Sequence, residues 1–258
     1  MADLVVAVLL LAAAGTYAAG VRRAGGRGRL VTPGQIGCFA GAMVTLAVAL
    51  LPPLAERADD GLVAHMVQHV LLLVVAAPLL ALAAPLPTLL RALPGVPGAT
   101  AWRRALRSHS RRWLAWVSAT LVVSSAVMLA WHAPVLYEAA LHHEVVHAFE
   151  HVSFLATATA FWWAVGLGAA RPRGGAVAAV FVAALPGTAL GAALTLAAKP
   201  WYPDYPSLAD QQLAGVVMWG FAGLAYVLAA AVVFGMWLRS VERDTPARPI
   251  SEREEVAA

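Results

Sequence analysis

Histidine is the residue type whose number and spacing in this chain point most directly to chemistry. Seven of its eight histidines fall close to the ends of apolar segments: His65, His69, His132, His142, His143, His147 and His151. Two runs, His65-Met-Val-Gln-His69 and His143-Glu-Val-Val-His147-Ala-Phe-Glu-His151, repeat the residue at every fourth position. On a helix this spacing places the imidazoles on one face, about one turn apart. Both runs therefore predict helix faces lined with imidazole.

These imidazoles indicate a metal site. Imidazole is a common ligand of copper, zinc, iron and nickel, and thioether sulfur adds a preference for cuprous copper. A carboxylate beside such a ligand accepts the free imidazole N–H and orients the ring. The predicted set consists of His65, His69, His147 and His151 at its centre, His143, His132, Met66 and Met218 as additional ligands, and Glu150 and Asp210 as neighbouring carboxylates.

Several of these residues also have simple structural roles. A single histidine at a membrane interface, such as His132 taken alone, is commonly solvated or packed. Met66 and Met218, taken one at a time, are more typical of core packing. Asp210 opens the last apolar helix and suits a helix cap. The aromatic, proline-rich loop at residues 199–206 is expected to be a rigid turn at the membrane surface. The metal prediction therefore rests on the histidines acting together.

The elements that must position these residues are apolar. Of the 258 residues, 61% are hydrophobic and 12% are charged, and the mean hydropathy is +0.73. About 20 apolar residues in a helix cross a hydrocarbon core of roughly 30 Å. Seven such segments are predicted, at about residues 3–21, 34–54, 62–86, 113–132, 146–168, 175–197 and 212–238. The sequence thus predicts an all-α, polytopic transmembrane helix bundle over residues 1–240, followed by a charged, disordered cytoplasmic tail over residues 241–258.

Arginine is distributed unevenly between these segments. Alternate intervals and the tail contain the clusters Arg22, Arg23, Arg27 and Arg29, then Arg91, Arg103, Arg104, Arg107, Arg111 and Arg112, then Arg171 and Arg173, then Arg239 and Arg243. The other intervals contain only Arg57 and Lys199 as fixed positive charges. Because basic residues of short loops stay in the cytoplasm, the N-terminus is predicted outside and the C-terminus inside. At about 1.5 Å per residue, His69 and His151 then lie at similar depth below the outer surface, facing each other across the bundle.

Other features argue against several function classes. Cys38 is the single cysteine, so neither a disulfide framework nor a thiolate metal site can form within one chain. The pI is near 9.7, but the arginines lie between apolar segments rather than along one polar face, which argues against nucleic acid as a partner. The first apolar segment precedes its basic residues, which predicts a retained span rather than a cleaved signal peptide. Nucleophile elbow, phosphate-loop and dinucleotide motifs are absent from the sequence, so no enzymatic activity is expected.

Four sequence features together resemble a known family. They are His65-Met-Val-Gln-His69 leading into Ala76-Ala-Pro78, Trp131-His-Ala-Pro134, His147 with His151, and Asp210-Gln-Gln212 leading to Met218-Trp219. Over about residues 30–240 the chain resembles the CtaG family of bacterial cytochrome c oxidase assembly factors, the multi-span type found with caa-type oxidases. An unrelated single-span copper chaperone with cysteine ligands has the same family name, and this chain, with Cys38 alone, does not resemble it.

The resemblance implies a role in respiratory chain biogenesis at the bacterial plasma membrane. On this hypothesis the chain binds copper transiently at its outer histidines and passes it to a cytochrome c oxidase subunit, its client. Imidazole and thioether ligands without thiolates would hold cuprous copper loosely enough for release. Three alternatives stay open: a membrane cytochrome in which His69 and His151 ligate haem, a membrane oxygenase with a two-metal histidine site, and a scaffold whose histidines bind nothing.

Overall fold

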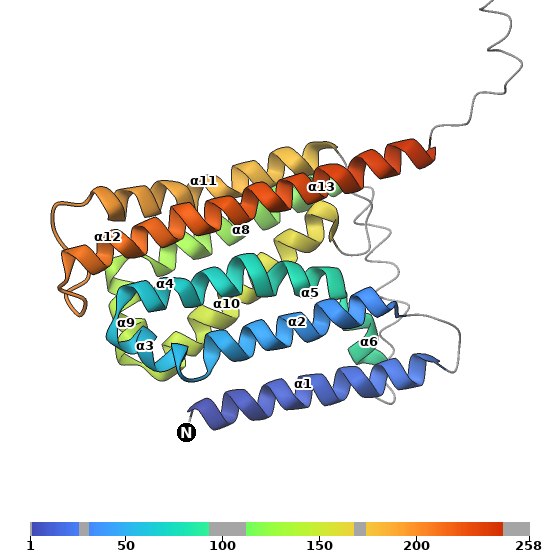
Figure 1. Cartoon of the computed structure of the whole chain (residues 1–258), viewed down its shortest axis with the longest axis horizontal. Coiled ribbons are helices and arrows are strands. Elements are labelled where there is room, and N and C mark those ends of the chain that lie inside the picture. The colour runs from blue at the N-terminus through green and yellow to red at the C-terminus, as the bar shows by residue number, and fades with distance from the viewer. Residues whose placement is uncertain (1, 26–30, 93–111, 168–173, 245–258) are drawn as a thin grey trace, which may run out of the picture.

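The computed structural model describes residues 2–25, 31–92, 112–167 and 174–244. Within these residues every regular element is a helix, and the long helices lie side by side as a bundle (Figure 1). The all-α prediction is confirmed. The elements, with η marking a π-helical segment, are α1 (Ala2–Gly25), α2 (Pro33–Leu50), α3 (Leu54–Asp60), α4 (Leu62–Val70), η1 (Leu71–Ala76), α5 (Ala77–Ala83), α6 (Pro85–Ala92), α8 (Trp113–Trp131), α9 (Pro134–His142), α10 (Glu144–Trp162), η2 (Trp163–Leu167), α11 (Gly174–Leu196), α12 (Leu208–Val216), η3 (Val217–Phe221) and α13 (Ala222–Asp244).

Six helical stretches of the described residues are long and apolar enough to cross a membrane. They are Asp3–Arg23, Pro33–Leu50, Leu62–Ala83, Trp113–Trp131, Gly174–Leu196 and Leu208–Arg243, and they correspond to six of the seven predicted spans. The seventh, residues 146–168, forms α10, which has 19 residues but contains two glutamates and two histidines. One face of α10 packs against α8 and α5, and its other face exposes Val145, Phe149 and Val152. The chain is a multi-pass helical membrane protein.

The outward faces of the spans are apolar. Leu11, Val122, Leu185 and Leu228 have between 60% and 72% of their surface exposed. In water such exposure would be unfavourable in proportion to its area. Lipid tails are as apolar as leucine, so the same surface is compatible with a membrane.

The two ends of the bundle differ in charge. At one end lie the short helices α3 and α9 and the starts of α1, α4 and α10 (Figure 1). The opposite end carries most of the described arginines, at helix termini: Arg22, Arg23, Arg112, Arg239 and Arg243. Arg57, on α3, is the exception within the part of the chain that the structure describes. The other arginines of the predicted basic intervals fall on residues 26–30, 91–111 and 168–173, whose side chains the structure does not describe. Most of the predicted tail, residues 245–258, also lies outside the described residues.

Helices α11 and α12 approach each other backbone to backbone. A Cβ atom at Gly215 would lie 2.5 Å from both the Gly191 carbonyl oxygen and Thr195 Oγ1, and one at Gly191 would lie 2.8 Å from the Gly215 carbonyl oxygen. Only a residue without a side chain fits at either position. Small residues at such crossings let membrane helices pack closely, and this one holds the start of the last span against α11.

Candidate metal centre

Helices α4 and α10 present their histidines to each other. The ring centroids of His65 and His69 on α4 lie 4.4 Å apart, and those of His147 and His151 on α10 lie 4.3 Å apart. Between the helices, His65 stacks on His147 at 5.3 Å, and His69 meets His151 edge-on at 5.5 Å. The prediction that His69 and His151 face each other is confirmed. We refer to these four residues as the imidazole cluster.

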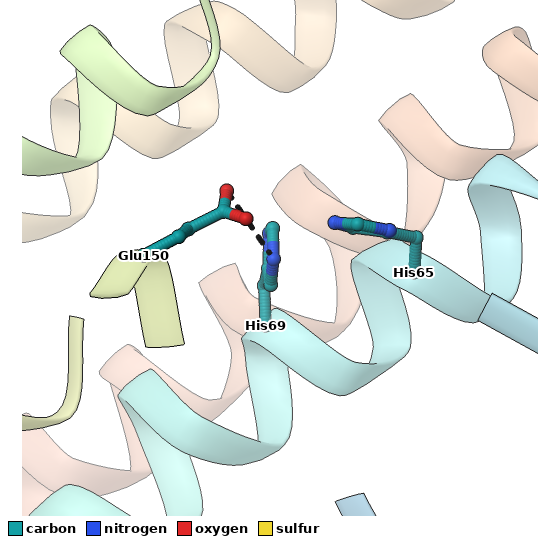
Figure 2. A group of neighbouring side chains, drawn as sticks. All are labelled: His65, His69 and Glu150. Atoms are coloured by element: carbon teal, nitrogen blue, oxygen red, sulfur yellow. Dashed lines mark ion pairs between the residues drawn. The ribbon is translucent and has the colours of Figure 1, made fainter. Parts of the chain in front are cut away.

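Glu150, on α10, completes two possible ligand groups. Its side chain is fully buried and points at His69, with Oε1 3.6 Å from Nε2 of that ring (Figure 2). Ligand atoms of His65, His69 and Glu150 all lie within 4.8 Å of one another, and so do those of His147, His151 and Glu150. Two donors held at about 2 Å from one ion lie at most about 4 Å apart. Small side-chain rotations would therefore bring either group to ligand distance.

Polar atoms of this site lack hydrogen-bond partners among the described residues. They include both nitrogens of His69, Nε2 of His147, Nε2 of His151 and both carboxyl oxygens of Glu150. The exposed fraction is 2% for His69 and 0% for Glu150. Leaving a buried polar group unpaired costs about 1–3 kcal/mol. A cation would pair with these lone pairs, so the site has the donor chemistry of a metal centre.

His132, which follows α8, lies beside the imidazole cluster. Its ring centroid is 5.7 Å from that of His69, and its exposed fraction is 3%. Its Nδ1 lies 2.7 Å from the Met128 carbonyl oxygen. A carbonyl only accepts, so Nδ1 donates, and in the neutral ring Nε2 keeps its lone pair. This Nε2 is buried without a partner in the described structure, which makes His132 available as the additional ligand that the sequence predicts.

The two predicted methionine ligands lie next to the cluster rather than within it. Met66 and Met218 are buried, and both line a cavity of about 60 Å³ that His69 and His132 also border. Met218 belongs to η3, and η1 begins two residues after His69. Single π-helical turns inside α-helices occur frequently at functional sites. Met66 and Met218 are therefore packed in the core and also border the cavity next to the imidazole cluster.

His142 and His143 lie apart from the imidazole cluster. His143 precedes the first residue of α10, and its side chain is exposed. His142, at the end of α9, is also exposed, with Nε2 3.0 Å from Asp204 Oδ2 and 3.9 Å from Glu138 Oε2. Burial, together with the neighbouring Asp204, raises the pKa of Glu138 above its usual range. The predicted helix face thus reaches the cluster only from His147 onward, because the helix starts at Glu144.

The Asp-Gln-Gln stretch positions the helices around the cluster. Asp210 Oδ2 accepts a hydrogen bond of 2.7 Å from the backbone N–H of Leu62, the first residue of α4. Gln211 Oε1 accepts one of 2.6 Å from the backbone N–H of Trp201. Gln212 Nε2 donates to the first carbonyl after α11, at 3.3 Å. The sequence offers Asp210 as a neighbour of an imidazole or as a cap of the last helix. In the structure its carboxylate binds the backbone of α4, and the N-cap of α12 is Ser207.

The loop before α12 covers the site with two tyrosines. Tyr202 and Tyr205 have exposed fractions of 0% and 5%, whereas Trp201 is 37% exposed. The Tyr202 hydroxyl donates to the His132 carbonyl at 3.0 Å, and the Tyr205 hydroxyl donates to the Ala58 carbonyl at 2.7 Å. Burial raises the pKa of both phenols above the usual range, so both remain donors. The expectation of a surface turn is wrong for these two rings, because their hydroxyls find buried carbonyl partners.

Two further aromatic residues surround the imidazoles and are missed by the sequence reasoning. The Tyr137 ring, from α9, lies 5.1 Å from that of His65 and 4.1 Å from that of Tyr202. The Phe154 ring, from α10, lies 4.8 Å from that of His69. Phe154 follows His147 by seven residues and so shares its helix face, which was an available signal. Tyr137 stands on a separate short helix and offered no periodic signal.

Comparison with known families identifies one match. The model of the family described as Cytochrome c oxidase caa3 assembly factor (Caa3_CtaG) matches residues 15–240, which include both histidine-bearing helices, the tyrosine loop and the Asp-Gln-Gln stretch. No curated protein and no solved structure matches the chain.

Proposed function

The chain belongs to the cytochrome c oxidase caa3 assembly factor family, and on that premise we propose that it is a copper donor for a respiratory oxidase. In this proposal the imidazole cluster and Glu150 bind copper, and an oxidase subunit receives it. The chain acts by binding and transfer and not by catalysis. Its membrane is the bacterial plasma membrane, in which the client oxidase is assembled.

The observation that carries this proposal is the convergence of four imidazoles, two buried and two half-buried, around one buried carboxylate. Ring distances of 4.3 to 5.5 Å join the histidines of two helices. Glu150 and His69 are buried, yet they lack hydrogen-bond partners among the described residues. A polar core selected for stability alone is normally hydrogen-bonded. The unpaired donor atoms are therefore best explained by an ion that they bind.

Copper fits the donor set. Copper(II) prefers nitrogen and oxygen ligands, and among divalent first-row ions it binds such sites most tightly. The cluster supplies imidazole nitrogens and one carboxylate, and the chain has no second cysteine with which to form a thiolate pair. Without thiolates the site avoids the strongest cuprous ligands, so an acceptor with a better ligand set can remove the ion.

Orientation determines where the copper would be delivered. The imidazole cluster lies toward the bundle end opposite the arginine-bearing helix termini. Arginine-rich ends stay in the cytoplasm. We therefore propose that the N-terminus is outside and the C-terminus inside, with α10 as the seventh span and the cluster near the outer surface.

A two-metal centre is the second candidate, because Glu150 belongs to both ligand groups. One carboxylate between two histidine pairs is an arrangement that can bridge two ions, as metal-dependent oxygenases would require. Iron at two equivalents per purified chain would favour this candidate over copper transfer. A stoichiometric Soret band would instead favour the haem alternative.

The test uses the full-length chain purified in detergent from copper-replete cells. We expect copper to co-purify with the unmodified protein and with the control His142→Ala, whose imidazole is exposed and outside the cluster. The double variant His65→Ala, His69→Ala should lose at least about tenfold in copper affinity, because two of the four imidazoles are gone. In copper-poor medium, cells with the double variant should make an oxidase of low activity that added copper partly restores. Full copper content in the double variant would refute the proposal.

A further inference from the structure

Beside the imidazole cluster, the bundle contains a cavity lined by methionines. It has a volume of about 60 Å³ and lies between η1, α8, α11 and the last span. Of the six methionines in the chain, three line it: Met66 from α4, Met128 from α8 and Met218 from η3. Their exposed fractions are 0%, 8% and 9%. Three separate elements therefore bring methionine side chains to one small cavity.

The same cavity is bordered by two imidazoles with unpaired nitrogens. Both nitrogens of His69 lack a hydrogen-bond partner among the described residues, and so does Nε2 of His132. The Nδ1 of His132 donates to the Met128 carbonyl, which leaves the lone pair on Nε2. Because His132 is 3% exposed, this lone pair has little access to water. A packing cavity would not need a buried nitrogen of this kind.

The charge of the lining selects the kind of ion. None of the described residues that line the cavity is a carboxylate, and apart from the imidazoles its polar side chains are Ser124, Ser125 and Tyr226. A divalent ion in such surroundings would keep most of its charge uncompensated, at a high desolvation cost. A monovalent soft ion has the lower cost, and thioether and imidazole are ligands that suit cuprous copper.

We propose that this cavity is a cuprous site distinct from the imidazole cluster, with the thioethers of Met66, Met128 and Met218 and the Nε2 of His132 as its ligands. His69 borders the cavity and also belongs to the group with His65 and Glu150, so it connects the two sites. The inference rests on the proposed copper function and deepens it. The carboxylate-containing cluster suits cupric ion, and the methionine-lined cavity suits cuprous ion.

X-ray absorption of the full-length chain loaded with one equivalent of cuprous ion tests the proposal. The unmodified protein should show sulfur as well as nitrogen around copper. The triple variant Met66→Leu, Met128→Leu, Met218→Leu conserves side-chain volume, and it should lose the sulfur signal and at least about tenfold in cuprous affinity. The control Met43→Leu, on α2 and away from the cavity, should behave as the unmodified protein. If the triple variant does not accumulate, Met128→Leu and Met218→Leu are measured singly, and each should reduce the sulfur signal.

Measurements of cupric binding distinguish a failure of the cuprous site from a failure of the proposed copper function. The triple variant should keep the cupric paramagnetic resonance signal of the imidazole cluster, and His147→Ala, His151→Ala should lose that signal while keeping sulfur around cuprous ion. Absence of sulfur in the unmodified protein, or an unchanged sulfur signal in the triple variant, overturns the cuprous site alone. A cupric signal that survives loss of His147 and His151 contradicts the proposed cluster instead.

Discussion

The Asp210 carboxylate, at the start of α12, accepts a hydrogen bond of 2.7 Å from the backbone N–H of Leu62, 148 residues earlier in the chain. Leu62 is the first residue of α4, and His65 follows one turn later. A helix start has unpaired N–H groups and a partial positive charge, and a carboxylate compensates for both. The last span thereby holds the N-terminus of the helix that carries two of the imidazoles.

Replacement of Asp210 by alanine should therefore weaken the metal site without removing a ligand. Hydrogen bonds to charged groups contribute about 1.5–3 kcal/mol, so the variant should unfold in detergent at lower temperature. Copper affinity should fall as well, because α4 loses its anchor. Asp60→Ala, an exposed residue at the end of α3, is the control and should change neither quantity. Unchanged copper affinity in Asp210→Ala would show that the hydrogen bond from Leu62 to Asp210 does not contribute to the metal site.

Glu150→Gln should lower copper affinity by about 10- to 100-fold. This is the usual effect of removing a carboxylate that contacts a metal-binding histidine. The amide has nearly the same shape, so the helix should remain folded. Because the buried Glu150 carboxyl has no hydrogen-bond partner among the described residues, its replacement should leave the metal-free protein at least as stable. Equilibrium copper binding and thermal unfolding are measured together, with the exposed Glu144→Gln of the same helix as the control. Lower stability together with unchanged copper affinity would assign Glu150 a purely structural role.

Tyr205→Phe should loosen the loop that covers the imidazole cluster and so increase access to it. The hydroxyl donates to the Ala58 carbonyl at 2.7 Å, and its loss should destabilise the loop by about 0.5–1.5 kcal/mol. Faster release of copper to a chelator and faster carbethoxylation of the histidines are the expected results. The control is Trp201→Phe, which changes the exposed ring of the same loop. It should change neither the rate of copper release nor the rate of carbethoxylation. Equal rates in Tyr205→Phe and the unmodified protein would show that the loop does not limit access.

Gly215→Ala should destabilise the bundle. Its new Cβ would lie 2.5 Å from the Gly191 carbonyl oxygen and Thr195 Oγ1, and relieving such overpacking costs about 1–3 kcal/mol or more. Unfolding in denaturing detergent measures the loss. Gly223→Ala, whose Cβ would meet nothing within 4 Å, is the matched control in the same span and should be as stable as the unmodified protein. Similar stability of the two variants would mean that α11 and α12 can separate freely.

The orientation proposal predicts the side of each bundle end. A reporter fused after Arg239 should report the cytoplasm, and one inserted near Glu138, on α9, should report the exterior. The reversed result would place the imidazole cluster inside the cell and contradict delivery of copper on the outer side.

The sequence by itself determined six of the seven predicted spans and the contents of two helix faces. Hydropathy over windows of about 20 residues reflects the thickness of the membrane, which is independent of how helices pack. The four-residue spacing of His65 with His69, and of His147 with His151, needs only helix geometry. Its limits appear in α10, where Glu144, Glu150 and the histidines lower the apolar content of a helix that the bundle nevertheless includes.

Depth along the helices predicted that His69 and His151 face each other, but the packing that brings the faces together was decided only by the tertiary structure. Rotation of a helix about its own axis depends on long-range packing, such as the crossing of Gly191 and Gly215, and is not encoded in local spacing. The return of the loop with Tyr202 and Tyr205 over the site depends on buried carbonyls elsewhere in the chain. For the same reason the sequence could not predict that the Asp210 carboxylate binds the start of α4. Its partner is an unpaired backbone donor that lies close in space but 148 residues away in the chain.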